Sequence, residues 1–157
     1  MKINCFCVGE TAFSYINEGI NEYDRRLQHF AAWGWTILPN IKNAKNFSEA
    51  QLREKEGEMI LKKLEESDFL VLLDERGKQY SSPELAEQLN TWQQQSSRRL
   101  VFLIGGAYGF SDAVYARAQG KISLSRLTFS HQMVRLFFAE QLYRAFAILN
   151  NLPYHHA

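Results

Sequence analysis

The residues whose types and spacing could do chemistry lie in the last third of this 157-residue chain. Gly105, Gly106 and Gly109 follow an apolar run, and glycines let the backbone approach a ligand closely because they lack a Cβ. Their spacing is not that of the dinucleotide fingerprint, and no Gly-Lys-Ser/Thr follows as in a phosphate-binding P-loop. The glycines therefore indicate either a ligand-binding loop or a plain tight turn from strand to helix.

Ionisable side chains follow at helical spacings. His131 and Arg135 are four residues apart, as are Glu140 and Arg144, so each pair would share one helix face. The second pair has the order that favours a helix ion pair. These groups lie in the most apolar helix of the chain, and buried charge needs a partner, so we expect Arg144 to face a site. A simple salt bridge is the alternative interpretation.

Other catalytic chemistries find less support. We expect no metal, because no second Cys/His pair with zinc-ligand spacing accompanies the chain's cysteines and histidines. A catalytic serine is compatible with the composition, but the Gly-x-Ser-x-Gly elbow is absent. Cys5 and Cys7 are two residues apart in a strand-like run, where a disulfide is geometrically awkward. They are either a redox or metal pair or two small core residues.

Charge is distributed unevenly along the chain. Residues 1–97 carry 11 Lys/Arg and 15 Asp/Glu, net −4, whereas residues 98–157 carry 7 and 2, net +5. The C-terminal part therefore suits an anionic partner, unless it is only an unevenly charged solvated surface. The longest apolar stretch contains charges and the N-terminal one is too short for a signal peptide, so we expect a cytoplasmic protein without a membrane partner.

The elements that must position these groups alternate between strand and helix. Strands are expected at 1–8, 33–38, 69–73, 100–104 and 121–124. Helices are expected at about 11–30, 48–66, 111–119 and 131–150, and a further helix begins at 82. This order predicts one α/β domain over 1–157, with a mostly parallel sheet flanked by helices. Ligands bind beyond the carboxyl ends of such strands, which here are Leu73-Asp74, Ile104 to Gly106, and 124–129.

The last expected helix is apolar on nearly every face between Met133 and Leu149. A helix of this kind is buried on several sides. We expect a homodimer in which a second subunit covers this helix. A central helix within a monomer is the alternative.

Five segments follow one another in the second half of the chain: Leu103-Ile104-Gly105-Gly106-x-x-Gly109, Ser123-Leu124-Ser125-x-Leu127-Thr128, His131-x-x-x-Arg135, Glu140-Gln141-Leu142-Tyr143-Arg144-Ala145 and Pro153-Tyr154-His155. In this order they resemble the RlmH family of large-subunit ribosomal RNA pseudouridine N3-methyltransferases, of the SPOUT superfamily. Ala107-Tyr108 stands where many relatives carry Pro-Glu, and Ser130 stands where Pro commonly precedes the histidine. Both departures lie beside the expected ligand loops.

The resemblance implies a C-terminal trefoil knot that holds S-adenosylmethionine, and a homodimer. The cofactor-binding residues that it implies are Leu73, Gly105, Leu124, Ser125, Arg126, Leu127, Thr128 and Phe129. The implied catalytic or substrate-positioning groups are Arg144, Tyr154 and His155, with His131 and Arg135 as further substrate-binding residues.

The implied substrate is a pseudouridine of 23S rRNA within the assembled ribosome. Candidate phosphate contacts are Arg98, Arg99, Lys121, Arg126 and Arg135. Two other classes stay open: a non-catalytic ribosome-binding protein on this fold, and a methyltransferase that acts on tRNA or a small molecule.

Overall fold

The computed structural model describes residues 1–96 and 98–156, and within them five strands form one parallel sheet. The strands are β1 (Lys2–Val8), β2 (Ala32–Leu38), β3 (Asp68–Gln79), β4 (Arg99–Ile104) and β5 (Gly120–Ser123). Their order across the sheet is β2-β1-β4-β3-β5, and every neighbouring pair runs parallel. The expected α/β class with a parallel sheet flanked by helices is confirmed.

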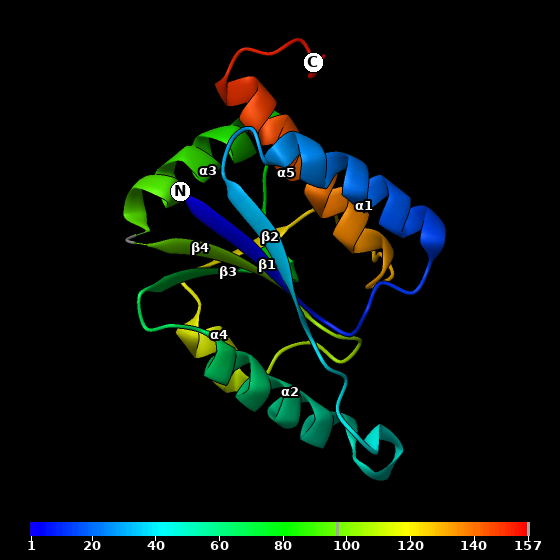
Figure 1. Cartoon of the computed structure of the whole chain (residues 1–157). Coiled ribbons are helices and arrows are strands. Elements are labelled where there is room, and N and C mark those ends of the chain that lie inside the picture. Colours follow the sequence, from blue (N-terminus) through cyan, green and yellow to red (C-terminus); the bar gives the residue numbers. More distant parts are fainter. Residues whose placement is uncertain (97, 157) are drawn as a thin grey trace.

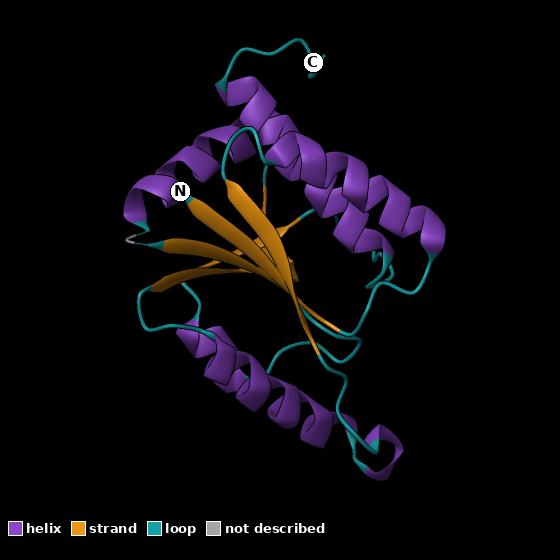
Figure 2. Cartoon of the chain, viewed as in Figure 1, coloured by secondary structure: helices purple, strands orange, loops and turns teal. Residues whose placement is uncertain are grey.

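Helices cover both faces of this sheet (Figures 1 and 2). They are α1 (Ser14–Leu27), α2 (Glu49–Lys63), α3 (Ser82–Gln95), α4 (Asp112–Arg117) and α5 (Met133–Leu149), with a short 3₁₀ turn at Ala44–Asn46. Helices α1, α3 and α5 lie on one face, whereas α2 and α4 lie on the other. The last helix is therefore part of a packed layer, in contact with both α1 and α3.

The core divides into two layers because side chains alternate along each strand. On β1, Ile3, Cys5 and Cys7 pack on the face covered by α1, α3 and α5, while Phe6 and Val8 pack toward α2 and α4. Both cysteines are free and fully buried. Cys5 and Cys7 therefore lie where two small core residues would lie, which was the second of the two interpretations of this pair.

Serine caps determine where three helices begin. Ser48 and Gln51 have the sequence spacing that predicts a capping box, and they form this box at the start of α2. The cap of α3 is Ser81, which pairs with Glu84. The pair Ser82-Pro83 predicts the cap at Ser82, with proline at the first helical position, and this prediction is wrong by one residue. The hydroxyl of Ser111 accepts the backbone N–H of Val114 at 3.3 Å and starts α4 as predicted.

Strand β3 is longer than the sequence predicts, because the polar residues after Leu73 continue it to Gln79. After an irregularity in the register, Lys78 pairs with Ile122 and Gln79 with Ser123 of β5. A Cβ on Gly77 would lie 2.5 Å from the backbone carbonyl carbon of Ile122, so only glycine permits this approach. The polar composition of 74–79 predicts a loop after the strand at 69–73, and this prediction is wrong. Residues 74–76 form one wall of the site described below.

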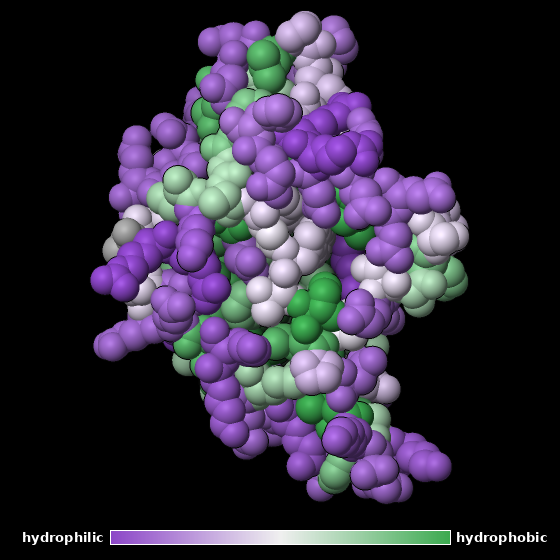
Figure 3. All heavy atoms as spheres, viewed as in Figure 1, coloured by the Kyte–Doolittle hydropathy of each residue, from purple (hydrophilic) through white to green (hydrophobic). Residues whose placement is uncertain are grey.

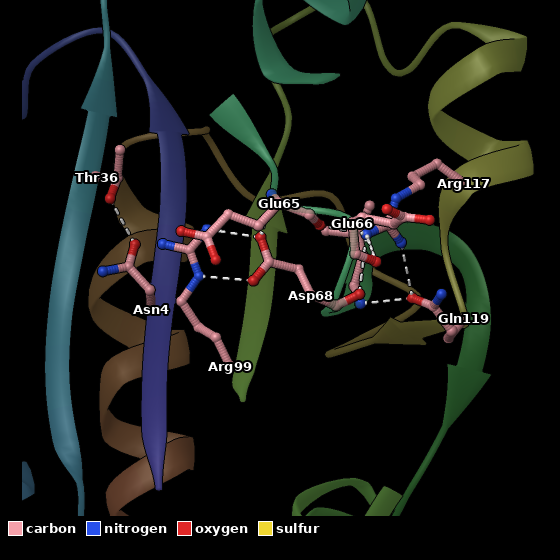
Figure 4. Close-up of polar contacts among 9 residues, drawn as sticks. Asn4, Thr36, Glu65, Glu66, Asp68, Arg99, Arg117 and Gln119 are labelled. Carbon is pink, nitrogen blue, oxygen red and sulfur yellow. Dashed lines mark hydrogen bonds and ion pairs between the residues drawn. The ribbon is translucent and has the colours of Figure 1, made fainter. Parts of the chain in front are cut away.

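A buried carboxylate holds the amino-terminal ends of the central strands together (Figure 4). The side chain of Asp68 accepts Nε and Nη2 of Arg99 at 2.9 and 2.6 Å. The side chain of Arg117 donates to the main-chain oxygen of Asp68 at 2.9 Å, and Gln119 accepts the N–H of Leu70. The guanidinium of Arg99 is thus engaged by a buried structural partner, which corrects the expected role of Arg99 as a phosphate contact.

Asp68→Ala is expected to lower the free energy of unfolding by about 3–5 kcal/mol, because it leaves the Arg99 charge in a largely buried position without a partner. Urea unfolding followed by circular dichroism measures this difference. Glu66→Ala is the matched control, since its exposed carboxylate lies nearby and its loss should change stability by less than about 0.5 kcal/mol. Equal stability of the two variants would contradict the structural role of the ion pair.

Strand β2 forms one edge of the sheet, and the middle of the strand is only partly buried. In Figure 3, which has the same view as Figure 1, hydrophobic and neutral residues gather across the middle of the molecule, between largely hydrophilic helical surfaces. Among the described residues, no helix has the length and apolar character needed to cross a membrane.

Candidate active site

A cavity of about 500 Å³ lies at the carboxyl ends of β3, β4 and β5. Three segments line it: 73–76 of β3, the loop after β4 from Ile104 to Phe110, and the loop between β5 and α5. This is the edge at which open parallel sheets bind ligands. All three strand ends singled out in the sequence therefore meet at one site.

Most of the residues expected to hold a cofactor lie on the wall of this cavity. They are Leu73, Gly105, Leu124, Ser125, Leu127, Thr128 and Phe129, and His131 lines the same wall. Arg126 does not line it, and its side chain is exposed to solvent. The structure thus places Arg126 beside the cavity and leaves it accessible from outside.

The glycine loop approaches the protein's own side chains closely. A Cβ on Gly105 would lie 2.8 Å from Cε1 of Phe110, whose ring lines the cavity. Gly109 has a φ of +82°, a conformation that favours glycine. Tyr108 in this loop is held through its carbonyl oxygen, which accepts Nη1 of Arg53 at 3.3 Å. The unusual Ala107-Tyr108 pair therefore leaves the loop anchored to α2.

The second departure from the family pattern lies where α5 begins. The hydroxyl of Ser130 accepts the backbone N–H of Met133 at 3.1 Å. It thus satisfies one of the unpaired donors at the start of this helix. Serine therefore supports the loop before α5 by a hydrogen bond that proline could not make.

Polar groups missed in the sequence lie on the extension of β3. The carboxylate of Asp74 accepts the hydroxyl of Tyr115 and the backbone N–H of Arg76. Burial, followed by the hydrogen bond to Asp74, raises the pKa of Tyr115 to about 12, so its hydroxyl stays protonated. Thr128 donates to Glu75 at 3.0 Å and ties the β5–α5 loop to β3. The position of Asp74 and Glu75 directly after a buried strand was the only sequence signal for these two carboxylates.

The carboxylate of Glu56 lies behind the cavity wall. A Cβ on Gly106 would lie 2.9 Å from Oε1 of Glu56, so glycine at 106 makes room for this group of α2. Among the described residues the Glu56 side chain has no hydrogen-bond or ion-pair partner, and burial raises the pKa of its carboxyl above the usual value. The glycine loop is therefore packed against a partly desolvated charge.

Glu56→Gln is expected to stabilise the fold by up to about 1 kcal/mol near pH 7, because it removes this unpaired charge. The folded-state pKa is raised, so the penalty is absent below the unfolded pKa and develops as the pH rises through the folded pKa. The gain should therefore vanish near pH 4. Urea unfolding at both pH values tests this, with Glu54→Gln on the exposed side of α2 as control. A gain that is equal at pH 4 and 7 would contradict the explanation.

Arg135 does not face a substrate, contrary to its expected role. It is 1% exposed, and its guanidinium donates to the carbonyl oxygens of Val8, Gly9 and His131 and to the hydroxyl of Thr11. These bonds satisfy the backbone where β1 ends. Arg135 is thus a structural residue, and the reason is burial that the spacing His131-x-x-x-Arg135 did not reveal.

The other expected catalytic residues form a second cluster on α5 and the tail. Arg144 donates to Glu140 and to Nδ1 of His155, the latter at 3.0 Å. The guanidinium also lies over the ring of Tyr154, with 4.9 Å between Cζ and the ring centroid. The hydroxyl of Tyr154 donates to Oε1 of Glu140 at 3.0 Å. The expectation that Arg144 takes part in more than a helix salt bridge agrees with this geometry.

Helix α1 completes this cluster with residues that sequence reasoning did not select as functional. The hydroxyls of Tyr23 and Tyr154 lie 2.9 Å apart, and Arg26 stacks near the rings of Tyr23, Tyr143 and Tyr154. Tyr154 and His155 of the tail are therefore packed onto two helices.

The cavity wall and the second cluster, around Arg144, do not meet within one protomer. Val134 lines the cavity and Arg144 anchors the second cluster, and ten residues of helix separate them, which is about 15 Å along the axis. The cofactor wall and the groups of the C-terminal tail thus lie toward opposite ends of α5.

A parallel sheet with a cavity at the carboxyl ends of its strands is typical of open-sheet α/β proteins that bind ligands at this edge. The model of the family described as predicted SPOUT methyltransferase matches residues 1–155. The chain therefore belongs to the SPOUT methyltransferase family.

Relatives match it over almost their whole length. Three proteins called ribosomal RNA large subunit methyltransferase H, from Parabacteroides distasonis, Christiangramia forsetii and Flavobacterium johnsoniae, are 54%, 53% and 52% identical to the chain. Each alignment spans 156 residues and covers 99% of both chains.

Proposed function

We propose that this protein transfers a methyl group from S-adenosylmethionine to N3 of a pseudouridine in 23S rRNA, with the assembled ribosome as substrate. The observation that carries the proposal is the meeting of the three strand ends at one cavity, in a chain whose relatives at 52–54% identity are called ribosomal RNA large subunit methyltransferase H. The C-terminal excess of basic residues supports an RNA partner.

The cavity walls fit S-adenosylmethionine. The volume of about 500 Å³ lies within the range of small-molecule sites. Leu73, Leu124 and Leu127 offer apolar surface for an adenine ring, and the backbone of the 124–129 loop offers hydrogen-bonding groups. The carboxylates of Asp74 and Glu75 favour a ligand that carries positive charge. Bound there, S-adenosylmethionine would supply an activated methyl group on its sulfonium.

A homodimer would bring the second cluster of one subunit to the cavity of the other. The cavity and the second cluster lie about 15 Å apart along α5, so one protomer cannot present both to the same nucleotide. Apolar side chains are exposed next to the cavity, with Leu127 at 73% and Phe137 at 40%, and Phe137 packs against Phe129. A second copy covering this part of α5 would bury them. This arrangement supports the dimer expected from the sequence.

The reaction requires the protein to position the substrate and to stabilise the charge that develops on it. The N3 atom must lie in line with the methyl carbon, and holding it there supplies much of the rate enhancement. Arg144 would stabilise the negative charge that develops as the N3 proton leaves. His155 and Tyr154 would contact the base, and His131 would contact the substrate from the cavity wall. Arg98, Lys121 and Arg126 are exposed and would bind phosphates.

We further propose that residues 1–157 act as one domain whose C-terminal part forms the trefoil knot of the superfamily. Two features support the knot: β5 reaches the far side of β3 through α4, and the chain then returns to the opposite face, where α5 contacts α1 and α3. Because its substrate would be the ribosome, the protein would work in the cytoplasm.

Transfer of radiolabelled methyl from S-adenosylmethionine to purified ribosomes from cells lacking this gene tests the proposal. Free 23S rRNA and bulk tRNA are assayed in parallel. Label should enter 23S rRNA, and only within ribosomes. Label in tRNA would refute the proposed substrate, and absence of both label and cofactor binding would favour the non-catalytic ribosome-binding protein.

A further inference from the structure

We infer that His155 acts in this reaction as a hydrogen-bond donor through its Nε2–H, and that it is not the group that accepts the N3 proton. The inference rests on the proposed function, and it adds a chemical role and a tautomer for one residue. It follows from how each polar group of the second cluster uses its donors and acceptors.

Arg144 determines which nitrogen of His155 carries the proton. Its Nη1 lies 3.0 Å from Nδ1 of His155. A guanidinium has N–H donors and no acceptor, so Nδ1 must accept this hydrogen bond. In the neutral imidazole the proton is then on Nε2, the other ring nitrogen. Among the described residues Nε2 has no hydrogen-bond partner, and His155 is only partly buried, so the Nε2–H is free to donate.

Arg144 is itself held in its donating position. It makes an ion pair with Glu140, one turn earlier on α5, and stacks on Tyr154. The hydrogen bond to Glu140 raises the pKa of Arg144 above its already high usual value, so the guanidinium stays charged. If His155 took a proton on Nδ1, two N–H donors would face each other. If it took one on Nε2, that atom would first have to give up its own proton.

Tyr154 and Glu140 offer no free base either. A carboxylate can only accept, so the single proton of Tyr154 is committed to Oε1 of Glu140 and the hydroxyl of Tyr23 must donate to Tyr154. Burial and these hydrogen bonds raise the pKa of Tyr154 well above its usual value. Oε2 of Glu140 accepts the side-chain amide of Gln141 at 2.7 Å. The cluster therefore presents N–H donors to a ligand and keeps its acceptors occupied.

This arrangement suits the negative charge that methylation creates. As the N3–H bond breaks, the proton passes to water, and the charge left behind spreads over N3 and the two flanking carbonyl oxygens. The N3 electron pair then forms the new N–C bond while the C–S bond breaks and leaves its pair on sulfur. A fixed Nε2–H beside one carbonyl oxygen lowers the energy of the charged state, as donors of an oxyanion hole do.

Three substitutions of His155 separate donation from proton acceptance. A glutamine side chain can place an amide N–H where Nε2–H lies but cannot act as a base. An asparagine side chain reaches only the Nδ1 position, so it can accept from Arg144 without offering the outer donor. We expect His155→Ala and His155→Asn to lower methyl transfer by about 100-fold or more and His155→Gln to stay within about 10-fold of the native protein. His156→Ala, at the exposed neighbour, is the matched control.

The tautomer can be measured without any reaction. In the full-length protein labelled with ¹⁵N-histidine, long-range ¹H–¹⁵N spectra distinguish a protonated from an unprotonated ring nitrogen, and His155→Gln identifies the resonances. We expect an unprotonated Nδ1 and a protonated Nε2, a pattern that Arg144→Ala should abolish. A proton on Nδ1 of His155, or a His155→Gln variant as inactive as His155→Ala, would overturn the inference. If the native protein methylates no ribosomes, the proposed function fails, and the spectra still decide the tautomer.

Discussion

Arg144→Ala is expected to lower methyl transfer to ribosomes by about 1000-fold while leaving the binding of S-adenosylmethionine unchanged. The guanidinium connects Glu140, Tyr154 and His155, so its loss removes a positive charge and at the same time the hydrogen bond that holds His155. Removal of one such electrostatic group typically costs two to three orders of magnitude. None of these residues belongs to the wall of the cavity, so cofactor affinity should not depend on Arg144.

The measurement is methyl transfer at saturating cofactor, with cofactor affinity followed by calorimetry on the same preparations. Arg144→Lys keeps the charge but cannot bridge Glu140 and His155 in the same plane, so it should recover only part of the activity. Arg25→Ala is a suitable control, because Arg25 is an exposed arginine in an ion pair with Glu22 on α1. The prediction would be refuted if Arg144→Ala kept full activity, or if it lost cofactor binding as much as activity, because the cavity is proposed to bind the cofactor and the Arg144 cluster to promote the reaction.

Gly105→Ala is expected to weaken the binding of S-adenosylmethionine by about 10- to 100-fold. The new Cβ would lie 2.8 Å from the ring of Phe110, which is almost fully buried and packs against Tyr115. The ring must therefore move, and it lines the cavity. Overpacking of this kind costs about 1–3 kcal/mol, and tenfold in affinity corresponds to about 1.4 kcal/mol.

Calorimetric titration of the cofactor measures this effect, with thermal unfolding as a check that the fold is intact. Gly120→Ala provides a matched control, because a Cβ there would meet no atom closer than 3.7 Å and the residue lies outside the cavity. Its cofactor affinity should equal that of the native protein. Unchanged affinity in Gly105→Ala would show that the ring of Phe110 is not part of the binding wall.

The locally encoded features could be predicted well. The start of α2 follows from Ser48 and Gln51, whose side chains satisfy backbone groups within one turn. The buried strands β3 and β4 begin with continuous apolar runs, and the glycines after Ile104 come directly at a strand end. Such patterns depend on neighbours within a few residues, and the alternation of these elements is enough to predict a parallel sheet with its ligand site at the carboxyl edge.

Contacts between distant parts of the chain could not be read from the same patterns. Arg135 has the spacing of a surface pair with His131, yet it is buried against the end of β1, more than 120 residues earlier. The polar stretch after Leu73 reads as a loop, and it becomes strand only because β5 pairs with it beside Gly77. In both places a long-range partner satisfies polar groups that local patterns assign to solvent.

The sequence by itself therefore determined the class of fold, the membership in the SPOUT family and most of the expected residues of the cavity wall, since these depend on local periodicity and on motifs in order. Only the tertiary structure decided that Arg144, Tyr154 and His155 gather with Glu140 and Tyr23 at one end of α5, away from the cavity. The physical reason is that a hydrogen-bond network depends on directions and distances between elements. Residue types along a chain specify which groups can donate or accept, and packing alone determines which of them meet.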